Sequence, residues 1–138
     1  MIVEVYTPAN DAEATDSAPS EHQGKFVHIV GPQEEFLVLS PIELTEYHAH
    51  IVQRFSRRRA DLSSVSTPAG DVVLFGTPGW SIKGGGRYRL DRGHRTLSLW
   101  GSSKAYGQFD GEHLRDTLKI TSGWEDFAVD LDGPSEHR

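Results

Sequence analysis

Three consecutive glycines, Gly84, Gly85 and Gly86, lie in a stretch from residue 80 to residue 90 that is otherwise typical of a β-strand. Glycines in a strand cost stability, because each one loses more backbone entropy on folding than alanine does and offers no side chain to pack. The triplet therefore indicates either the close approach of a ligand or another backbone segment, or a sharp bend through a β-bulge. The bend is the more common explanation, and the sequence leaves both open.

Several other segments are typical of β-strands, because apolar residues alternate or run together between turn residues. They comprise a short strand or ordered arm at 1–6 and strands at 25–30, 35–39, 71–75, 95–100 and 127–131. The strand at 25–30 stops at Gly31-Pro32 and the next begins at Glu35, so we expect these two to form a hairpin. We interpret 60–70 as a loop.

The sequence Ser40-Pro41-Ile42-Glu43 predicts the start of a helix. Serine is favoured at the N-cap, proline is tolerated at the first helical position, and a glutamate three residues after the serine completes a capping box. We expect this helix to continue to about Arg59, because the basic residues of its last turn favour the negative end of the helix dipole. Its apolar stripe consists of Leu44, Ile51, Val52 and Phe55.

A second helix is expected after Asp110, which can act as its N-cap, with Glu112 in the first turn. Leu114 and Leu118 would be its buried pair. Lys119, followed by a glycine four residues later, marks its end.

These elements do not alternate as in β-α-β units, which indicates an α+β fold: a mixed sheet of six or more strands flanked by two helices. At 138 residues, the chain is long enough for a single domain, 1–138, with one core. We expect a flexible acidic loop at 7–23, where large apolar residues are absent, and a mobile tail at 132–138.

Composition excludes several classes of function. The chain has no cysteine, which excludes disulfides, cysteine-based phosphatase chemistry and thiolate metal sites. The longest apolar run is too short to span a bilayer, and the N-terminus does not have the pattern of a signal peptide, so we expect a cytoplasmic protein without a membrane partner. The formal net charge of −6 argues against nonspecific nucleic-acid binding.

The charges are distributed unevenly along the chain. Residues 54–104 hold ten of the 14 Lys and Arg residues but three of the 20 Asp and Glu residues, which gives this segment a net charge of +7. A locally basic segment suits an anionic ligand. A solvated basic face without a ligand accounts for the charge equally well.

His48 lies within the apolar stripe of the first expected helix, so it should face the sheet or the edge of the core. A lone histidine in such a place is usually a core residue, bonded through one nitrogen to a carbonyl. His50 is about 200° further round the helix, so the two histidines cannot share a metal there. The seven histidines show no ligand spacing such as HExxH, and we expect no metal site.

The strand at 95–100 ends in a loop of small residues, 101–107. Small residues leave backbone N–H groups unobstructed, Ser103 adds a hydroxyl and Lys104 adds a charge, so this loop can form an anion-binding concavity. Arg87, directly after the glycine triplet, is well placed to present its guanidinium to a phosphate. A plain connection between strand and helix is the alternative for the loop.

Three segments, on a helix, a strand and a loop in that order, resemble the small phosphohistidine phosphatase family, also called Janus/Ocnus. They are Glu46-Tyr47-His48-Ala49, Gly84-Gly85-Gly86-Arg87 and Ser103-Lys104-Ala105-Tyr106-Gly107. The resemblance covers about residues 25–129 and implies a mixed six-stranded sheet with two helices. It also implies an enzyme that removes phosphate from phosphohistidine-containing proteins or small phosphoramidates, without metal or cofactor. We expect the protein to be a monomer. The chain departs from the family at Ser40, where vertebrate members have an arginine, and in additional residues that include 71–79.

The resemblance implies a catalytic His48, substrate-binding Lys25 and Arg87, and a phosphate-binding loop of Ser103, Lys104 and Ala105. In the mechanism that we expect, neutral His48 acts as general base on a water in line with the phosphorus–nitrogen bond. Attack of His48 itself on phosphorus is the mechanistic alternative. A noncatalytic phosphate- or phosphopeptide-binding module would use the same basic pocket, and a structural domain would use the glycines only for a bend.

Overall fold

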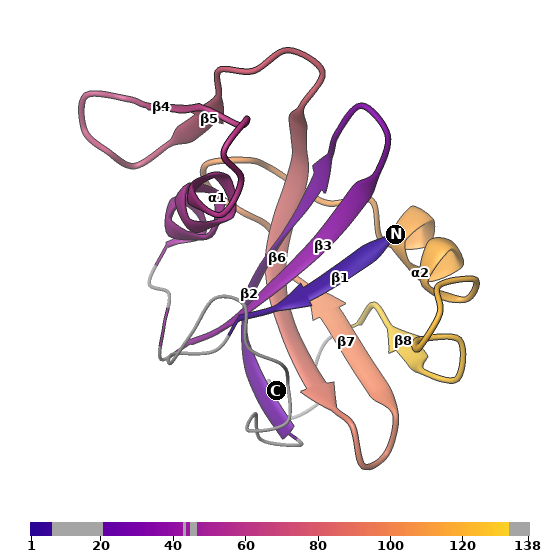
Figure 1. Ribbon diagram of the computed structural model, residues 1–138. Helices are drawn as coiled ribbons and strands as arrows, with labels where there is room; N and C mark the ends of the chain where they lie inside the picture. The colour runs from indigo at the N-terminus through magenta and orange to yellow at the C-terminus, as the bar shows by residue number, and fades with distance from the viewer. Residues whose placement is uncertain (7–20, 43, 45–46, 133–138) are drawn as a thin grey trace.

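The structure is a computed structural model that describes residues 1–6, 21–42, 44 and 47–132. Its main element is a six-stranded sheet in the order β1-β3-β2-β6-β7-β8 (Figure 1). These strands are β1 (Ile2–Val5), β2 (Glu21–Val30), β3 (Glu35–Pro41), β6 (Ser81–Asp91), β7 (Thr96–Trp100) and β8 (Ala128–Asp130). Pairing is antiparallel in the centre and parallel at both edges. Together with helices α1 (His48–Arg57) and α2 (Gly111–Leu118), the mixed sheet confirms the expected α+β fold.

The two helices cover opposite faces of the sheet (Figure 1). Successive residues of a strand point to opposite faces, and the core is divided accordingly. On the face of α1, Val27, Ile29 and Val38 of the sheet pack with helix residues Ala49, Ile51, Val52 and Phe55. On the face of α2, Phe26, Leu37 and Leu39 pack with Leu114 and Leu118. Each side chain of the sheet therefore lies either on the face covered by α1 or on the face covered by α2.

A small two-stranded sheet extends from the α1 side of the molecule (Figure 1). It consists of β4 (Ser64–Ser66) and β5 (Val73–Phe75), paired antiparallel. The strand expected at 71–75 is therefore confirmed in shorter form, whereas its partner falls in the segment that we interpreted as a loop. All three residues of β4 are exposed, so the sequence has no apolar pattern there that would predict a strand.

The predicted start of the first helix is wrong. Ser40 and Pro41 continue β3 to its end, where Ser40 pairs with Lys25 and is fully buried. Pairing with β2 outweighs the local capping pattern, and Glu43, the other half of the proposed capping box, lies outside the described residues. Helix α1 begins at His48, where no side chain caps it, and ends at Arg57.

The second helix is confirmed. The Asp110 Oδ1 accepts a hydrogen bond from the backbone N–H of His113 at 3.1 Å, and Leu114 and Leu118 are fully buried. Lys119 is the C-cap, as expected. Neither helix in the described part of the chain is long and apolar enough to cross a membrane.

The expected hairpin is confirmed by the antiparallel pairing of β2 with β3. Strand β2 begins earlier than predicted, because residues 21–23 pair with residues 89–91 of β6. These three residues therefore belong to the sheet and not to the predicted flexible loop, since pairing with β6 outweighs their polar composition. The rest of that loop, 7–20, and residues 133–138 of the predicted tail lie outside the described residues.

Candidate functional site

The glycine triplet lies in β6 where other backbone segments come very close. A Cβ on Gly84, whose φ is 136°, would lie 2.5 Å from the carbonyl oxygen of Gln108, and one on Gly85 would lie 2.6 Å from that of Phe26. The register with β2 also shifts beside the triplet, between His28 and Ile29. Both explanations that the sequence left open therefore apply in part, since the strand is irregular here and a backbone approaches it closely.

The triplet also makes room for His48. A Cβ on Gly85 would lie 3.0 Å from the Cδ2 of His48, so the imidazole rests directly on the glycine backbone. His48 is the first residue of α1 and its Nε2 lies 2.8 Å from the carbonyl oxygen of Gly86. A carbonyl can only accept a hydrogen bond, so the Nε2 carries the hydrogen and the Nδ1 keeps its lone pair.

The surroundings of His48 favour the neutral imidazole. The residue is 9% exposed, and its burial lowers the pKa of His48. The hydrogen bond to Gly86 opposes this effect, and the charges of Lys25 and Arg87 lower the pKa further. The position at the N-terminal end of α1 also disfavours a positive charge, because the helix dipole is positive there. A neutral histidine with a lone pair on Nδ1 can accept a proton or attack an electrophile.

His48 lies in the wall of a pocket of about 660 Å³ that also gathers the expected cations. Lys25 of β2 and Arg87 of β6 are directly opposite each other, and Lys104 comes from the loop after β7. Like charges opposite each other on a sheet are destabilising, and an anion bound between them would remove this repulsion. Asp71, just before β5, is the acidic group among the described residues of the wall.

The loop 101–107 differs from expectation at Ser103. This residue is buried, and among the described residues Ser102 rather than Ser103 lines the pocket. The backbone N–H of Ser103 donates to the carbonyl oxygen of Gly107 at 3.1 Å, and its hydroxyl accepts from the backbone N–H of Tyr106 at 3.1 Å. The polar groups of Ser103 therefore hold the loop in shape.

Lys104 and Ala105 line the pocket, as the sequence led us to expect. Their backbone N–H groups donate no hydrogen bond to any residue that the structure describes. Consecutive N–H groups of this kind, beside cationic side chains, are suited to the oxygens of a phosphate.

Sequence reasoning missed the role of Tyr106 in supporting this loop. Its hydroxyl donates to the carbonyl oxygen of Val73 at 2.8 Å and accepts from the backbone N–H of the same residue at 3.0 Å. Burial raises the pKa of Tyr106, against a smaller opposing effect of the bond to Val73. The contact joins the loop to β5 and brings Asp71 to the pocket. Tyr106 belongs to the segment 103–107 that carries the family resemblance, but nothing near it in the sequence indicated a hydrogen-bond partner 33 residues away.

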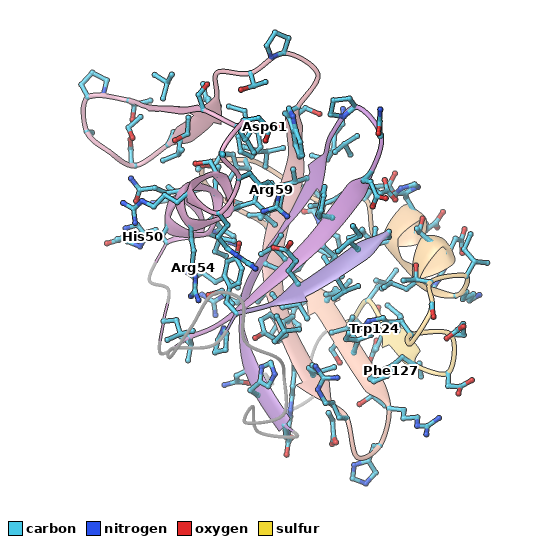
Figure 2. All side chains as sticks on the ribbon, in the orientation of Figure 1. His50, Arg54, Arg59, Asp61, Trp124 and Phe127 are labelled. Carbon is cyan, nitrogen blue, oxygen red and sulfur yellow. The ribbon has the colours of Figure 1, made fainter. Side chains whose placement is uncertain are left out.

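His50 lies away from this group of residues. Figure 2 shows it on the side of α1 that faces away from the sheet, and its side chain is exposed. Its ring packs edge-on against Tyr47, with 5.5 Å between centroids. The expectation that His48 and His50 point to different faces is confirmed.

A model of the Janus/Ocnus family (Ocnus) matches residues 23–128 of the chain. No curated protein matches the chain. The identification with small phosphohistidine phosphatases is wrong, because the matching description assigns the Janus/Ocnus family and not a family of phosphohistidine phosphatases. Three short motifs located a group of residues, and they did not suffice to name an activity.

Proposed function

The chain belongs to the Janus/Ocnus family, and from the chemistry of its pocket we propose that it hydrolyses phosphorus–nitrogen bonds, with His48 as general base. The substrates would be phosphohistidine-containing proteins or small phosphoramidates. The observation that carries this proposal is the hydrogen bond from the His48 Nε2 to Gly86, because it leaves a lone pair on Nδ1 in a pocket that is also lined by Lys25, Arg87 and Lys104.

In the proposed step, the Nδ1 of His48 accepts a proton from a water molecule while the water oxygen attacks phosphorus. The phosphorus–nitrogen bond breaks, and its electron pair goes to the nitrogen of the leaving group. That nitrogen then takes up a proton, from His48 or from solvent, so that the products are inorganic phosphate and the free imidazole or amine. Such a base needs a pKa near or below the working pH, and the lowered pKa of His48 meets this requirement.

The cations and the loop supply the electrostatic part of the proposal. The side chains of Lys25 and Arg87 and the N–H groups of Lys104 and Ala105 would balance the charge on the phosphoryl oxygens during transfer. Holding water, phosphorus and the leaving nitrogen in line supplies a further part of the rate, because the phosphoramidate bond is already labile.

Covalent catalysis by His48 would use the same Nδ1 lone pair to attack phosphorus directly. Quench-flow followed by mass spectrometry distinguishes the two routes. A general base leaves His48 unmodified throughout turnover, whereas the covalent route produces a phosphorylated His48.

The free space and the cations would also serve a noncatalytic module that binds phosphate or a phosphopeptide. The favouring observation is the direct opposition of Lys25 and Arg87, which suits an anion whether or not a reaction follows. Such a module would have no use for a neutral histidine, so we rank it second.

The test is to incubate the EDTA-treated protein with phosphoramidate and with a phosphohistidine peptide, and to measure free phosphate. The proposal requires catalytic release from at least one of the two substrates, and release from neither overturns it. Binding of inorganic phosphate without turnover would favour the noncatalytic module.

We further propose that the protein acts in the cytoplasm as a monomer, without nucleic-acid or membrane partners. Gel filtration tests the oligomeric state, and cell fractionation tests the location.

A further inference from the structure

A second group of side chains meets on the opposite face of the sheet from His48. His28 of β2, Glu35 of β3 and His113 of α2 each offer one ligand atom, and these atoms all lie within 4.8 Å of one another. They lie in a separate pocket of about 740 Å³ beside α2. We infer that these three side chains bind a Zn²⁺ ion.

The fold explains how these three residues meet. His28 is opposite Leu37 in the β2–β3 pair, so Glu35 is its diagonal neighbour, two residues away on the same face. His113 is in the first turn of α2, where its backbone N–H bonds to the N-cap Asp110. We expected no metal site because the histidines show no ligand spacing such as HExxH; these three residues come from two strands and a helix, so only the fold brings them together.

The distances suit a tetrahedral ion. The His113 Nε2 lies 3.0 and 3.1 Å from the two carboxylate oxygens of Glu35, and the His28 Nε2 lies 3.4 Å from one of them. Zn²⁺ bonds of about 2.0–2.1 Å place tetrahedral ligand atoms about 3.3–3.5 Å apart. Small side-chain rotations would therefore suffice, and two histidines with one carboxylate are a common ligand set for this ion.

The surroundings of His28 also favour a ligand. The residue is 3% exposed and its Nε2 contact with Glu35, at 3.4 Å, is long for a hydrogen bond. A buried imidazole nitrogen so weakly satisfied is costly, and coordination through Nε2 would replace the long contact with a strong bond.

Metal ligands must be deprotonated, so coordination here would use the neutral imidazoles of His28 and His113 and the carboxylate form of Glu35. Three protein ligands leave a fourth position, on the pocket side, for water or a small ligand.

The alternative is that the cluster is purely structural. The His113–Glu35 ion pair and the stacked rings of His28 and His113, 5.6 Å apart between centroids, would then join α2 to the hairpin. This alternative gives the protein no more affinity for a metal than any exposed histidine–carboxylate pair has.

The test is a titration of chelator-stripped full-length protein with Zn²⁺ by calorimetry and with Co²⁺ by visible absorption. We expect one ion per chain and the absorption of tetrahedral Co²⁺. The variants Glu35→Gln and His113→Gln should each weaken binding by at least about tenfold. The matched control is His94→Gln, which removes an exposed histidine that also contacts a carboxylate, Asp91, at 2.8 Å; it should bind as the wild type does.

Thermal melts keep the test decisive if a variant is less stable. Zn²⁺ should raise the melting temperature of the wild type and of His94→Gln, and raise that of the two ligand variants less at the same zinc concentration, because an ion that binds the folded state stabilises it in proportion to its affinity. Absence of saturable micromolar binding by the wild type overturns the inference, and so does equal binding by all four proteins. Neither readout uses turnover, so the result is independent of the function proposed for the His48 pocket.

Discussion

The two faces of the central sheet each carry a pocket built around a buried histidine, but the neighbours of that histidine have opposite charge. On the α1 face, His48 lies among Lys25, Arg87 and Lys104. On the α2 face, His28 contacts the carboxylate of Glu35. Burial is the largest influence on both residues and lowers both pKa values.

A hydrogen bond to Gly86 raises the pKa of His48 in part, but the influence of the neighbouring charged side chains differs in sign between the pockets. Lys25 and Arg87 lower the pKa of His48 further. Glu35 instead raises the pKa of His28 and so opposes the effect of burial on that pKa. Both histidines are therefore neutral, but the first pocket suits an anion and the second suits a cation. Burial favours the neutral imidazole in each pocket, and the neighbouring charges determine which sign of ligand each pocket suits.

The largest expected effect is that of His48→Ala on hydrolysis. Loss of a general base should lower kcat/KM for phosphoramidate by about 10²–10⁴-fold, with the fold retained by circular dichroism. The control His50→Ala removes an exposed histidine from the other side of the same helix (Figure 2) and should keep most of the activity. If His48→Ala folds normally and turns over at near wild-type rates, the assignment of His48 fails; if it unfolds, His48 is chiefly a core residue.

The cations of the same pocket should give the next largest effect. Lys25→Ala and Arg87→Ala should each raise KM and lower kcat, because both side chains are proposed to contact oxygens in binding and in transfer. Loss of one charge-assisted contact costs about 1.5–3 kcal/mol, or roughly 10- to 150-fold in kcat/KM. The control is Arg95→Ala, an exposed arginine paired with Asp126 outside the pocket. Unchanged kinetics in both pocket variants would place the anion site elsewhere.

Tyr106→Phe tests the support of the phosphate loop. The change removes the hydroxyl that bonds both to the carbonyl and to the N–H of Val73. Each lost hydrogen bond should cost about 0.5–1.5 kcal/mol of stability, measured by urea denaturation. KM should rise several-fold, since the N–H groups of Lys104 and Ala105 are less well held, while the zinc titration of the other pocket should stay unchanged.

The pH dependence of turnover should reveal the charges around His48. Because the pKa of His48 is below its ordinary value of 6.5, kcat/KM should stay high at pH 6.5 and fall only below it, as the base becomes protonated. Arg87→Ala removes a positive charge, so its acid limb should move to higher pH. Glu35→Gln changes the pocket on the opposite face and should leave the acid limb of the pH profile unchanged. If the acid limb of this variant shifts, the two pockets are coupled.

The smallest expected effect is that of chelation on hydrolysis, which should be none. Neither the proposed base nor the proposed phosphate contacts include a metal ligand, so EDTA should remove Zn²⁺ from the His28 group without changing kcat/KM. Activity that is lost on chelation and restored by zinc would overturn the metal-free mechanism and would link the two pockets.

Local patterns in the sequence determined much of the fold. The Asp110 cap and the apolar pair of Leu114 and Leu118 specified α2, and the β2–β3 hairpin followed from two apolar runs around a Gly-Pro turn. The same type of reasoning failed at Ser40, since a capping pattern acts over a few residues and could not reveal the pairing with Lys25.

The sequence by itself was also sufficient to select the basic segment, the glycine triplet and His48 as candidate parts of a site. Charge, backbone freedom and residue type are properties of single positions. Which atoms face one another was decided only by the tertiary structure. The bond to Gly86 selects the tautomer of His48, and the turn at 103–107 directs the polar groups of Ser103 inward. Folding also brings His28, Glu35 and His113 within reach of one ion. Each of these contacts joins separate elements or different parts of one turn, and their distances depend on how the strands register and the helices pack.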